Sequence, residues 1–290
     1  MNAVIRLFLL PIILFSWFRV YSQTPVGRAS SDTSSSFVIG VTEQFRSEIL
    51  DEQCIINVYL PEGYNTSDTA HFPVVYLLDG SADEDFIHVA GLFQYCGFSW
   101  VNCAPPSIVV GIATVDRRRD FTFPTTIASD KEKSPTSGRS ENFMKFLEEE
   151  LQPYVARRFR TNGERMLIGQ SLGGLLATEI LFKEPGMFDR YLIVSPSLWW
   201  DDGSLIQMDP PLLNEKNDTQ AKVYLAVGKE GLSPSEKPHV MEVDVNLLAE
   251  KIRASQNKNV QIYFDYLPDE DHATIMHQAV YNGLRHFFTK

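Results

Sequence analysis

The chain has 290 residues, of which 44% are hydrophobic and 22% charged, and its formal net charge at pH 7 is −11. The length suits one large α/β domain or at most two small ones, and the hydrophobic content excludes a disordered chain. The negative charge argues against proteins that bind nucleic acids or anionic membrane surfaces.

Residues 1–22 have the composition of a secretory signal peptide. Arg6 supplies a positive amino-terminal region, Leu7–Phe15 is largely apolar, and Ser22 is a small residue at a suitable cleavage position. An uncleaved membrane anchor is the alternative, because the apolar stretch is nearly long enough to span a bilayer. We therefore expect a secreted or periplasmic protein with no other membrane segment.

A flexible segment rich in Ser and Thr is expected over residues 23–36, followed by one domain over residues 37–290. The domain starts with two strands expected to pair antiparallel, Phe37–Phe45 and Ile49–Leu60. Apolar runs then predict further strands at Phe72–Leu78, Ser107–Ile112, Arg165–Ile168, Tyr191–Val194, Val223–Val227 and Val260–Tyr266. Helical spacing predicts helices at Asp83–Phe93, Ser140–Arg158, Leu175–Phe182, Val243–Ala254 and Thr274–Phe288.

The alternation of strands and helices predicts an α/β fold. We expect a mostly parallel central sheet with antiparallel N-terminal strands and helices on both faces. Ser140 is the expected N-cap of its helix, and Pro153 should kink that helix or divide it in two. Reactive groups in such a sheet gather beyond the carboxyl ends of the strands.

The segment Gly169–Gly173 has the pattern G-x-S-x-G between a predicted strand and a predicted helix. A serine at the apex of a strained strand-to-helix turn projects its hydroxyl above the sheet, and the glycines let neighbouring backbone pass close. We interpret Ser171 as a nucleophile and the Leu172 amide, at the helix N-terminus, as an oxyanion donor. The alternative is a Gly-rich turn that only lets the helix pack on the sheet.

A serine nucleophile needs a base and an acid that orients the base. Among six histidines, His272 alone follows the last predicted strand in a loop, which favours it as the base over a solvated histidine. Glu230 follows the predicted strand Val223–Val227 and is the favoured acid; the alternative is that it is a surface glutamate without a catalytic role. Asp201 and Asp202 are the other candidate acids.

Other residues after predicted strands are candidates for substrate contacts. The Ser81 amide is the expected second oxyanion donor, because its loop follows an earlier strand. Arg117 and Arg119 lie in a long irregular stretch and either bind substrate or form a solvated charge run. Trp199 either forms an aromatic wall of the substrate site or packs at its rim.

Three cysteines are present, and an odd number in an exported protein leaves at least one unpaired. Cys96 and Cys103 flank a short loop and either form a disulfide or remain free buried thiols, as Cys54 is expected to do within a strand. Metal-ligand spacings such as C-x-x-C and H-E-x-x-H are absent from the sequence, so we expect neither a metal nor another cofactor.

Taken in order, several motifs resemble the esterase family of α/β-hydrolases, specifically its esterase D and enterochelin (siderophore) esterase-like group. They are VYLPEGY at Val58–Tyr64, PVVYLLDG at Pro73–Gly80, DRRRDFTFPT at Asp116–Thr125, GQSLGG at Gly169–Gly174, SPSLWW at Ser195–Trp200, VGKEG at Val227–Gly231 and EDHAT at Glu270–Thr274. The resemblance implies an α/β-hydrolase fold with Ser171, Glu230 and His272 as nucleophile, acid and base. It also implies that Arg117 and Arg119 face the substrate.

These observations predict a serine esterase that works through an acyl-enzyme on a small-molecule ester. Siderophore lactones, feruloyl esters and short acyl esters are the candidate substrates. The alternatives are an acyltransferase of the same fold and a non-catalytic protein that binds siderophores or glycan esters.

Overall fold

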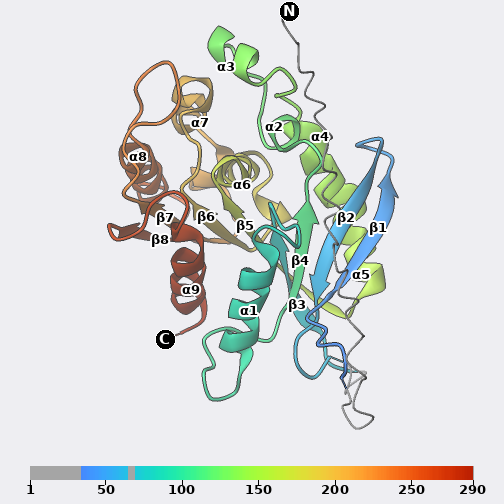
Figure 1. Ribbon diagram of the computed structural model, residues 1–290. Helices are drawn as coiled ribbons and strands as arrows, with labels where there is room; N and C mark the ends of the chain where they lie inside the picture. Colours follow the sequence, from blue (N-terminus) through green and yellow to red (C-terminus); the bar gives the residue numbers. More distant parts are fainter. Residues whose placement is uncertain (1–33, 65–68, 290) are drawn as a thin grey trace, which may run out of the picture. The chain divides into compact units, whose positions relative to one another are not determined.

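Eight strands form one sheet within residues 34–64 and 69–289, which the computed structural model describes (Figure 1). Their order is β1-β2-β4-β3-β5-β6-β7-β8. The strands are β1 (Val41–Ser47), β2 (Glu52–Tyr59), β3 (Phe72–Leu77), β4 (Ile108–Ala113), β5 (Thr161–Gln170), β6 (Arg190–Val194), β7 (Ala221–Gly228) and β8 (Val260–Leu267).

The pairing of the strands confirms the predicted sheet. β2 is antiparallel to both β1 and β4, and every other neighbouring pair is parallel. The predicted first strand was placed too early, because residues 37–40 form no strand and β1 starts at Val41. Since β5, β6, β7 and β8 are neighbours and run the same way, the loops that follow them lie along one edge of the sheet.

Helices cover both faces of the sheet (Figure 1). One face packs against α1 (Phe86–Gly97) and α9 (Ile275–Phe288). The other face packs against α4 (Ser140–Lys145), α5 (Gln152–Arg158), α6 (Leu172–Lys183) and α8 (Met241–Arg253). Shorter helices lie in the connecting loops: α2 (Arg117–Asp120), α3 (Ala128–Lys133) and α7 (Ser204–Gln207).

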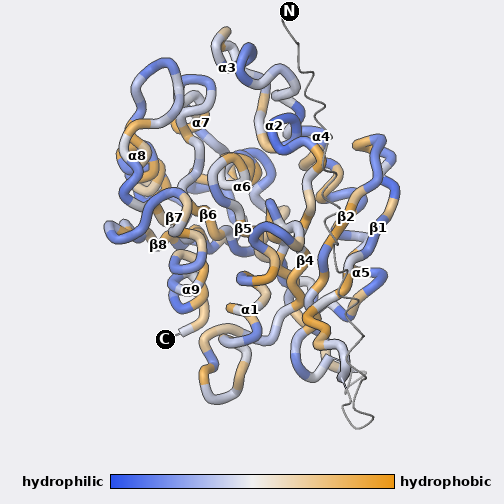
Figure 2. The backbone as a smooth tube through the Cα atoms, viewed as in Figure 1, coloured by the Kyte–Doolittle hydropathy of each residue, from blue (hydrophilic) through white to orange (hydrophobic). Residues whose placement is uncertain are grey.

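Strand β3 shows how the two faces are built. Val74 and Tyr76 belong to one hydrophobic core and Val75 and Leu77 to the other, as expected for side chains that alternate along a strand covered on both sides. Figure 2 shows hydrophobic residues along the central strands and hydrophilic residues in the outer loops. Burial of these apolar residues stabilises the sheet, which positions the loops that follow its strands.

The helix predicted at Ser140–Arg158 is interrupted. A π-helical segment, Phe146–Leu151, separates α4 from α5, and Pro153 lies at the start of α5. Proline lacks an N–H and crowds the carbonyl of the preceding turn, which widens the helix there. Ser140 is not the N-cap: Arg139 precedes the helix, and hydrogen bonds from the Arg139 and Ser140 amides to Arg119 O and Thr122 O fix the start one residue early.

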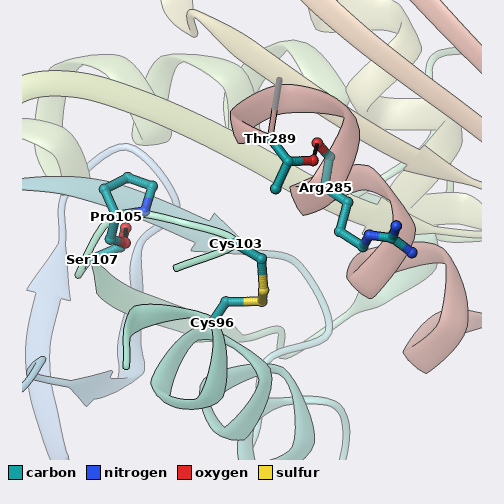
Figure 3. Close-up of a disulfide and its surroundings, with 6 residues drawn as sticks. All are labelled: Cys96, Cys103, Pro105, Ser107, Arg285 and Thr289. Atoms are coloured by element: carbon teal, nitrogen blue, oxygen red, sulfur yellow. Dashed lines mark hydrogen bonds between the residues drawn. A yellow bond between two sulfur atoms is a disulfide. The ribbon is translucent and has the colours of Figure 1, made fainter. Parts of the chain in front are cut away.

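Cys96 at the end of α1 and Cys103 in the following loop form a disulfide (Figure 3). Cys54 is free and buried, as predicted, and burial followed by the Glu52 charge raises the pKa of its thiol to about 12.

The predicted signal peptide and all but residues 34–36 of the predicted flexible segment lie outside the described residues. Within the described ranges, no helix has the length and apolarity needed to cross a membrane.

Candidate active site

Ser171 lies on a sharp turn between β5 and α6. Its φ of 59° and ψ of −119° are unusual for a residue with a side chain and cost on the order of 1–3 kcal/mol. The turn is fixed by its backbone: the Ser171 amide donates to Val194 O at 3.0 Å, and the Ser171 carbonyl accepts from the Ser197 amide at 3.0 Å. The strained turn is therefore held by the end of β6 and by the loop that follows it.

Two glycines are required for this turn. A Cβ on Gly169 would lie 2.5 Å from Gly173 O, and a Cβ on Gly174 would lie 2.9 Å from Pro196 Cα. Since real Cβ atoms do not approach backbone so closely, side chains at these positions would push α6 away from the sheet. The expectation that flanking glycines let backbone pass close is confirmed for Gly169, whereas a Cβ on Gly173 would meet the side chain of Leu78 at 3.3 Å.

His272 and Glu230 come from the loops after the neighbouring strands β8 and β7. The loops pack backbone against backbone, with the Lys229 amide donating to Glu270 O at 2.7 Å. Gly228 makes this possible, because a Cβ there would lie 2.6 Å from Glu270 O. The approach brings His272 Nδ1 to 2.6 Å from Glu230 Oε2.

The environment of Glu230 keeps its carboxylate ionised. Its side chain is only 4% exposed, and burial alone would raise its pKa. Hydrogen bonds from His272, Ser195 Oγ and the Gly228 amide outweigh burial and hold the pKa of Glu230 below its ordinary value. An ionised carboxylate can only accept, so Nδ1 of His272 carries a proton, and the neutral form of the imidazole has its lone pair on Nε2.

The serine turn and the histidine loop are joined through Gln170. The side-chain amide of Gln170, the residue before Ser171, donates to the main-chain oxygen of His272. Within the described part of the chain, the Ser171 hydroxyl bonds to Ser197 Oγ, at 3.3 Å, and not to the imidazole. The structure thus places the two loops together, with the serine hydroxyl turned to Ser197.

The two expected oxyanion donors belong to adjoining segments. Leu172 is the first residue of α6, so its amide is one of the unpaired donors of the helix N-terminus. Ser81 follows β3, which neighbours β5, and a Cβ on Gly173 would lie 3.4 Å from Asp79 Oδ2 of the same loop. The Ser81 hydroxyl itself lies within hydrogen-bond distance of two carboxylates, Asp83 at 2.9 Å and Glu84 at 2.7 Å.

Arg117 connects the β3 loop to the serine turn. Its Nε donates to Asp79 Oδ1 at 2.7 Å, and its Nη2 donates to Gln170 O at 3.3 Å. Burial raises the pKa of Asp79 and Arg117 opposes that rise in part. The Arg117 side chain is 37% exposed, so it is hydrogen-bonded to the turn and also accessible to solvent.

Arg119 is oriented differently, although both arginines belong to α2. Its Nε donates to Asp120 Oδ1 at 2.7 Å and its Nη2 to Glu52 Oε1 at 2.8 Å. These hydrogen bonds raise the pKa of Arg119 and engage its guanidinium with two carboxylates. The structure therefore ties Arg119 to β2 and not to the Ser171 turn.

Trp199 and the two alternative acids lie together after β6. Trp199 packs edge-to-face on Trp200 at 6.2 Å and lines a small recess with Asp202 and His239. Asp201 accepts from the Thr126 amide at 2.6 Å, while Asp202 pairs with Lys237. Neither aspartate contacts His272, so Glu230 is its carboxylate partner among the candidates.

Sequence reasoning missed Gln170, Ser195 and Ser197. The available signal was position: Ser195 and Ser197 follow β6, which lies between the strand of Ser171 and the strand of Glu230. Short polar residues after a strand are common, so the pattern alone does not mark them.

No cluster of three or more His, Cys, Asp or Glu suited to a metal ion occurs among residues 34–64 and 69–289.

Comparison with known proteins agrees with this architecture. The family model described as "Putative esterase" matches residues 47–274. The ferri-bacillibactin esterase BesA of Bacillus subtilis (strain 168) is 27% identical over 274 residues, which cover 89% of this chain and 93% of that protein. A siderophore triacetylfusarinine C esterase of Aspergillus fumigatus is 31% identical over 164 residues, 52% of this chain and 53% of that protein.

Solved structures show the same fold. An IroE-like serine hydrolase from Shewanella oneidensis superposes with a TM-score of 0.75 at 31% identity, covering 86% of this chain and 80% of that chain. The BES protein from Bacillus cereus gives 0.74 at 26% identity, with 88% and 96% covered. The chain belongs to this esterase family of α/β-hydrolases and is a carboxylic ester hydrolase.

Proposed function

We propose that the protein is an exported serine esterase that opens ester bonds of siderophores through an acyl-enzyme. One observation carries the proposal. The strained turn presents Ser171, and the loop bound to that turn by Gln170 presents an imidazole whose Nδ1 is held by an ionised Glu230. The proposed nucleophile, base and orienting acid thus follow β5, β8 and β7, whose ends lie along one edge of the sheet.

In the first step Ser171 Oγ attacks the ester carbonyl while His272 Nε2 takes the hydroxyl proton. The bond from the carbonyl carbon to the leaving oxygen then breaks, and the imidazolium returns its proton to that oxygen. Glu230 stabilises the transient positive charge without taking the proton. The proton of Ser171 must point toward His272, while Ser171 Oγ can keep accepting from Ser197 Oγ. Catalytic contacts of this kind are often loose in enzymes without substrate.

The oxyanion that forms on the carbonyl oxygen needs donors that are already in place. The Leu172 amide at the start of α6 and the Ser81 amide after β3 are the proposed pair. In the second step His272 removes a proton from water, the hydroxide attacks the acyl carbon, and the bond to Ser171 Oγ breaks as the proton returns to the serine. The products are a carboxylic acid and an alcohol.

Siderophore esters are the proposed substrates because BesA and the Aspergillus fumigatus relative both carry names of siderophore esterases. The half-exposed Arg117 and the partly buried Trp199 supply a cation and an aromatic surface beyond the serine turn. Arg119 forms ion pairs with Glu52 and Asp120, so we do not propose that it contacts the substrate. Export is supported by the signal-like leader and by the Cys96–Cys103 disulfide.

The test compares turnover of a catecholate trilactone siderophore, with and without Fe(III), against methyl ferulate and p-nitrophenyl butyrate. We expect the trilactone to give the highest kcat/KM, and Ser171→Ala to lose at least about a thousandfold for every ester that is cleaved. A higher kcat/KM for methyl ferulate would overturn the substrate class. Full activity of Ser171→Ala, with hydrolysis by the wild type, would overturn the serine mechanism.

A further inference from the structure

The segment Ser195-Pro196-Ser197 contacts two members of the proposed triad. It follows β6, which is hydrogen-bonded to β5 on one side and to β7 on the other. Ser171 follows β5, and Glu230 lies just beyond β7. A segment at this position can therefore reach both the nucleophile and the acid.

Ser195 binds the carboxylate oxygen of Glu230 that His272 does not use. Its Oγ donates to Glu230 Oε1, while His272 Nδ1 lies 2.6 Å from Oε2. Ser195 has no exposed surface, and its amide donates to Ala226 O at 2.8 Å. Its φ of 43° lies in the left-handed region, which the surrounding backbone must enforce. The hydroxyl is thus held rigidly against the acid.

Ser197 binds both the backbone and the hydroxyl of the nucleophile. Its amide donates to Ser171 O at 3.0 Å, and the two Oγ atoms are 3.3 Å apart. Ser197 is 2% exposed, so solvent does not compete for its hydroxyl. When Ser197 donates in this pair, the proton of Ser171 remains available for His272.

We infer that Ser195 and Ser197 are positioning residues of the esterase reaction, Ser195 fixing the carboxylate that orients His272 and Ser197 fixing the nucleophilic hydroxyl. This inference rests on the proposed function. Neither serine touches the reacting carbonyl in this scheme; each acts through a triad residue. The short β6 loop thereby couples the two ends of the triad, which belong to separate loops.

Removal of the Ser195 hydroxyl has a specific electrostatic consequence. Glu230 Oε1 would keep only the Gly228 amide, at 3.3 Å, so the carboxylate would become more basic. A more basic carboxylate favours the imidazolium form of His272, which is inactive as a base. The acidic limb of kcat/KM therefore moves to higher pH, an effect that loss of packing alone would not produce.

The experiment compares Ser195→Ala and Ser197→Ala with Ser107→Ala. Ser107 is also 2% exposed and its hydroxyl also has a hydrogen bond, to Pro105 O at 2.7 Å, but it lies before β4 at the opposite edge of the sheet. Ser195→Gly is a second variant, since glycine accepts the left-handed backbone and also lacks the hydroxyl. The readouts are kcat/KM for p-nitrophenyl butyrate from pH 5 to 9, the rate of fluorophosphonate labelling, and thermal unfolding.

We expect both Ser195 variants to lose about tenfold in kcat/KM at pH 7, the size expected for one hydrogen bond to a charged group. Their acidic limbs should move up by about half a pH unit. Ser197→Ala should label about tenfold more slowly with the limb unchanged, and Ser107→Ala should match wild type. Ser195 and Ser197 variants that match Ser107→Ala, while Ser171→Ala is inactive, would overturn this inference alone; an active Ser171→Ala would overturn the proposed function itself.

Discussion

His272 Nδ1 lies 2.6 Å from Glu230 Oε2, although the two residues are 42 positions apart in the chain. The contact exists because β7 and β8 are parallel neighbours whose following loops meet at Gly228 and Glu270. Because Glu230 stays ionised, the contact also selects the tautomer of His272 that has a free lone pair on Nε2.

Replacement of Glu230 by glutamine tests this contact. The amide retains the shape of the side chain but loses the charge that stabilises the imidazolium, so kcat for p-nitrophenyl butyrate should fall by about a hundredfold to ten-thousandfold. The loss should remain smaller than that of Ser171→Ala. Asp202→Asn is the control, because Asp202 pairs with Lys237 and should leave kcat within about twofold. Wild-type kcat for Glu230→Gln, together with an inactive Asp202→Asn, would identify Asp202 as the acid.

Arg119→Ala should lower stability without changing KM. Asp120, whose side chain is 1% exposed, would lose its cationic partner, and the unpaired carboxylate would cost about 3 kcal/mol. Thermal unfolding should then move down by about 6–12 °C. The double variant Arg119→Ala/Asp120→Asn should recover part of that loss. A raised KM with an unchanged unfolding temperature would instead show that Arg119 contacts the substrate.

Asp85 should make stability depend on pH. Burial, followed by the charges of Asp79 and Glu84, raises the pKa of Asp85 to about 6. Between this value and the ordinary pKa near 3.8 the folded protein holds a proton that the unfolded chain lacks, so Asp85 contributes stability that is lost as pH rises through 6.

Asp85→Asn should therefore raise the unfolding temperature at pH 8 and have little effect at pH 4. The Asp85 side chain makes no capping hydrogen bond to α1, so the substitution removes no cap. Unfolding is followed by circular dichroism at several pH values. Destabilisation at pH 8 would show that the charge of Asp85 is favourable in the folded protein.

The Cys96–Cys103 disulfide should stabilise the fold without serving catalysis. It closes a loop with a sequence separation of 7, for which chain entropy gives about 2 kcal/mol. The double variant Cys96→Ala/Cys103→Ala should unfold about 4–8 °C lower and keep its kcat. The bond lies between α1 and the loop before β4, so a large loss of kcat in a folded variant would contradict this separation.

Sequence patterns predicted the parts of the site that local structure defines. A short apolar run, a serine between glycines and a helical pattern predicted the turn at Ser171, and strand ends predicted the positions of Glu230 and His272. These predictions rest on local periodicity and on the rule that parallel strands end at one edge. The fold class and the buried Cys54 were predictable for the same reason.

Contacts between distant segments could not be predicted. Arg117 and Arg119 are separated by one residue, yet one points to Asp79 and Gln170 and the other to Glu52 and Asp120. Their difference depends on how α2 packs against the sheet, which no local pattern encodes. Ser195 and Ser197 acquire their partners only because β6 lies between β5 and β7.

Detection of the acyl-enzyme is the most direct test of Ser171 as the nucleophile. The wild-type protein and Ser171→Ala are mixed with p-nitrophenyl butyrate, quenched in acid within milliseconds, digested and analysed by mass spectrometry. We expect a butyryl group on the peptide that contains Ser171 in the wild type and none in the variant. Catalytic hydrolysis with the acyl group on another residue, or equal turnover by Ser171→Ala, would contradict it.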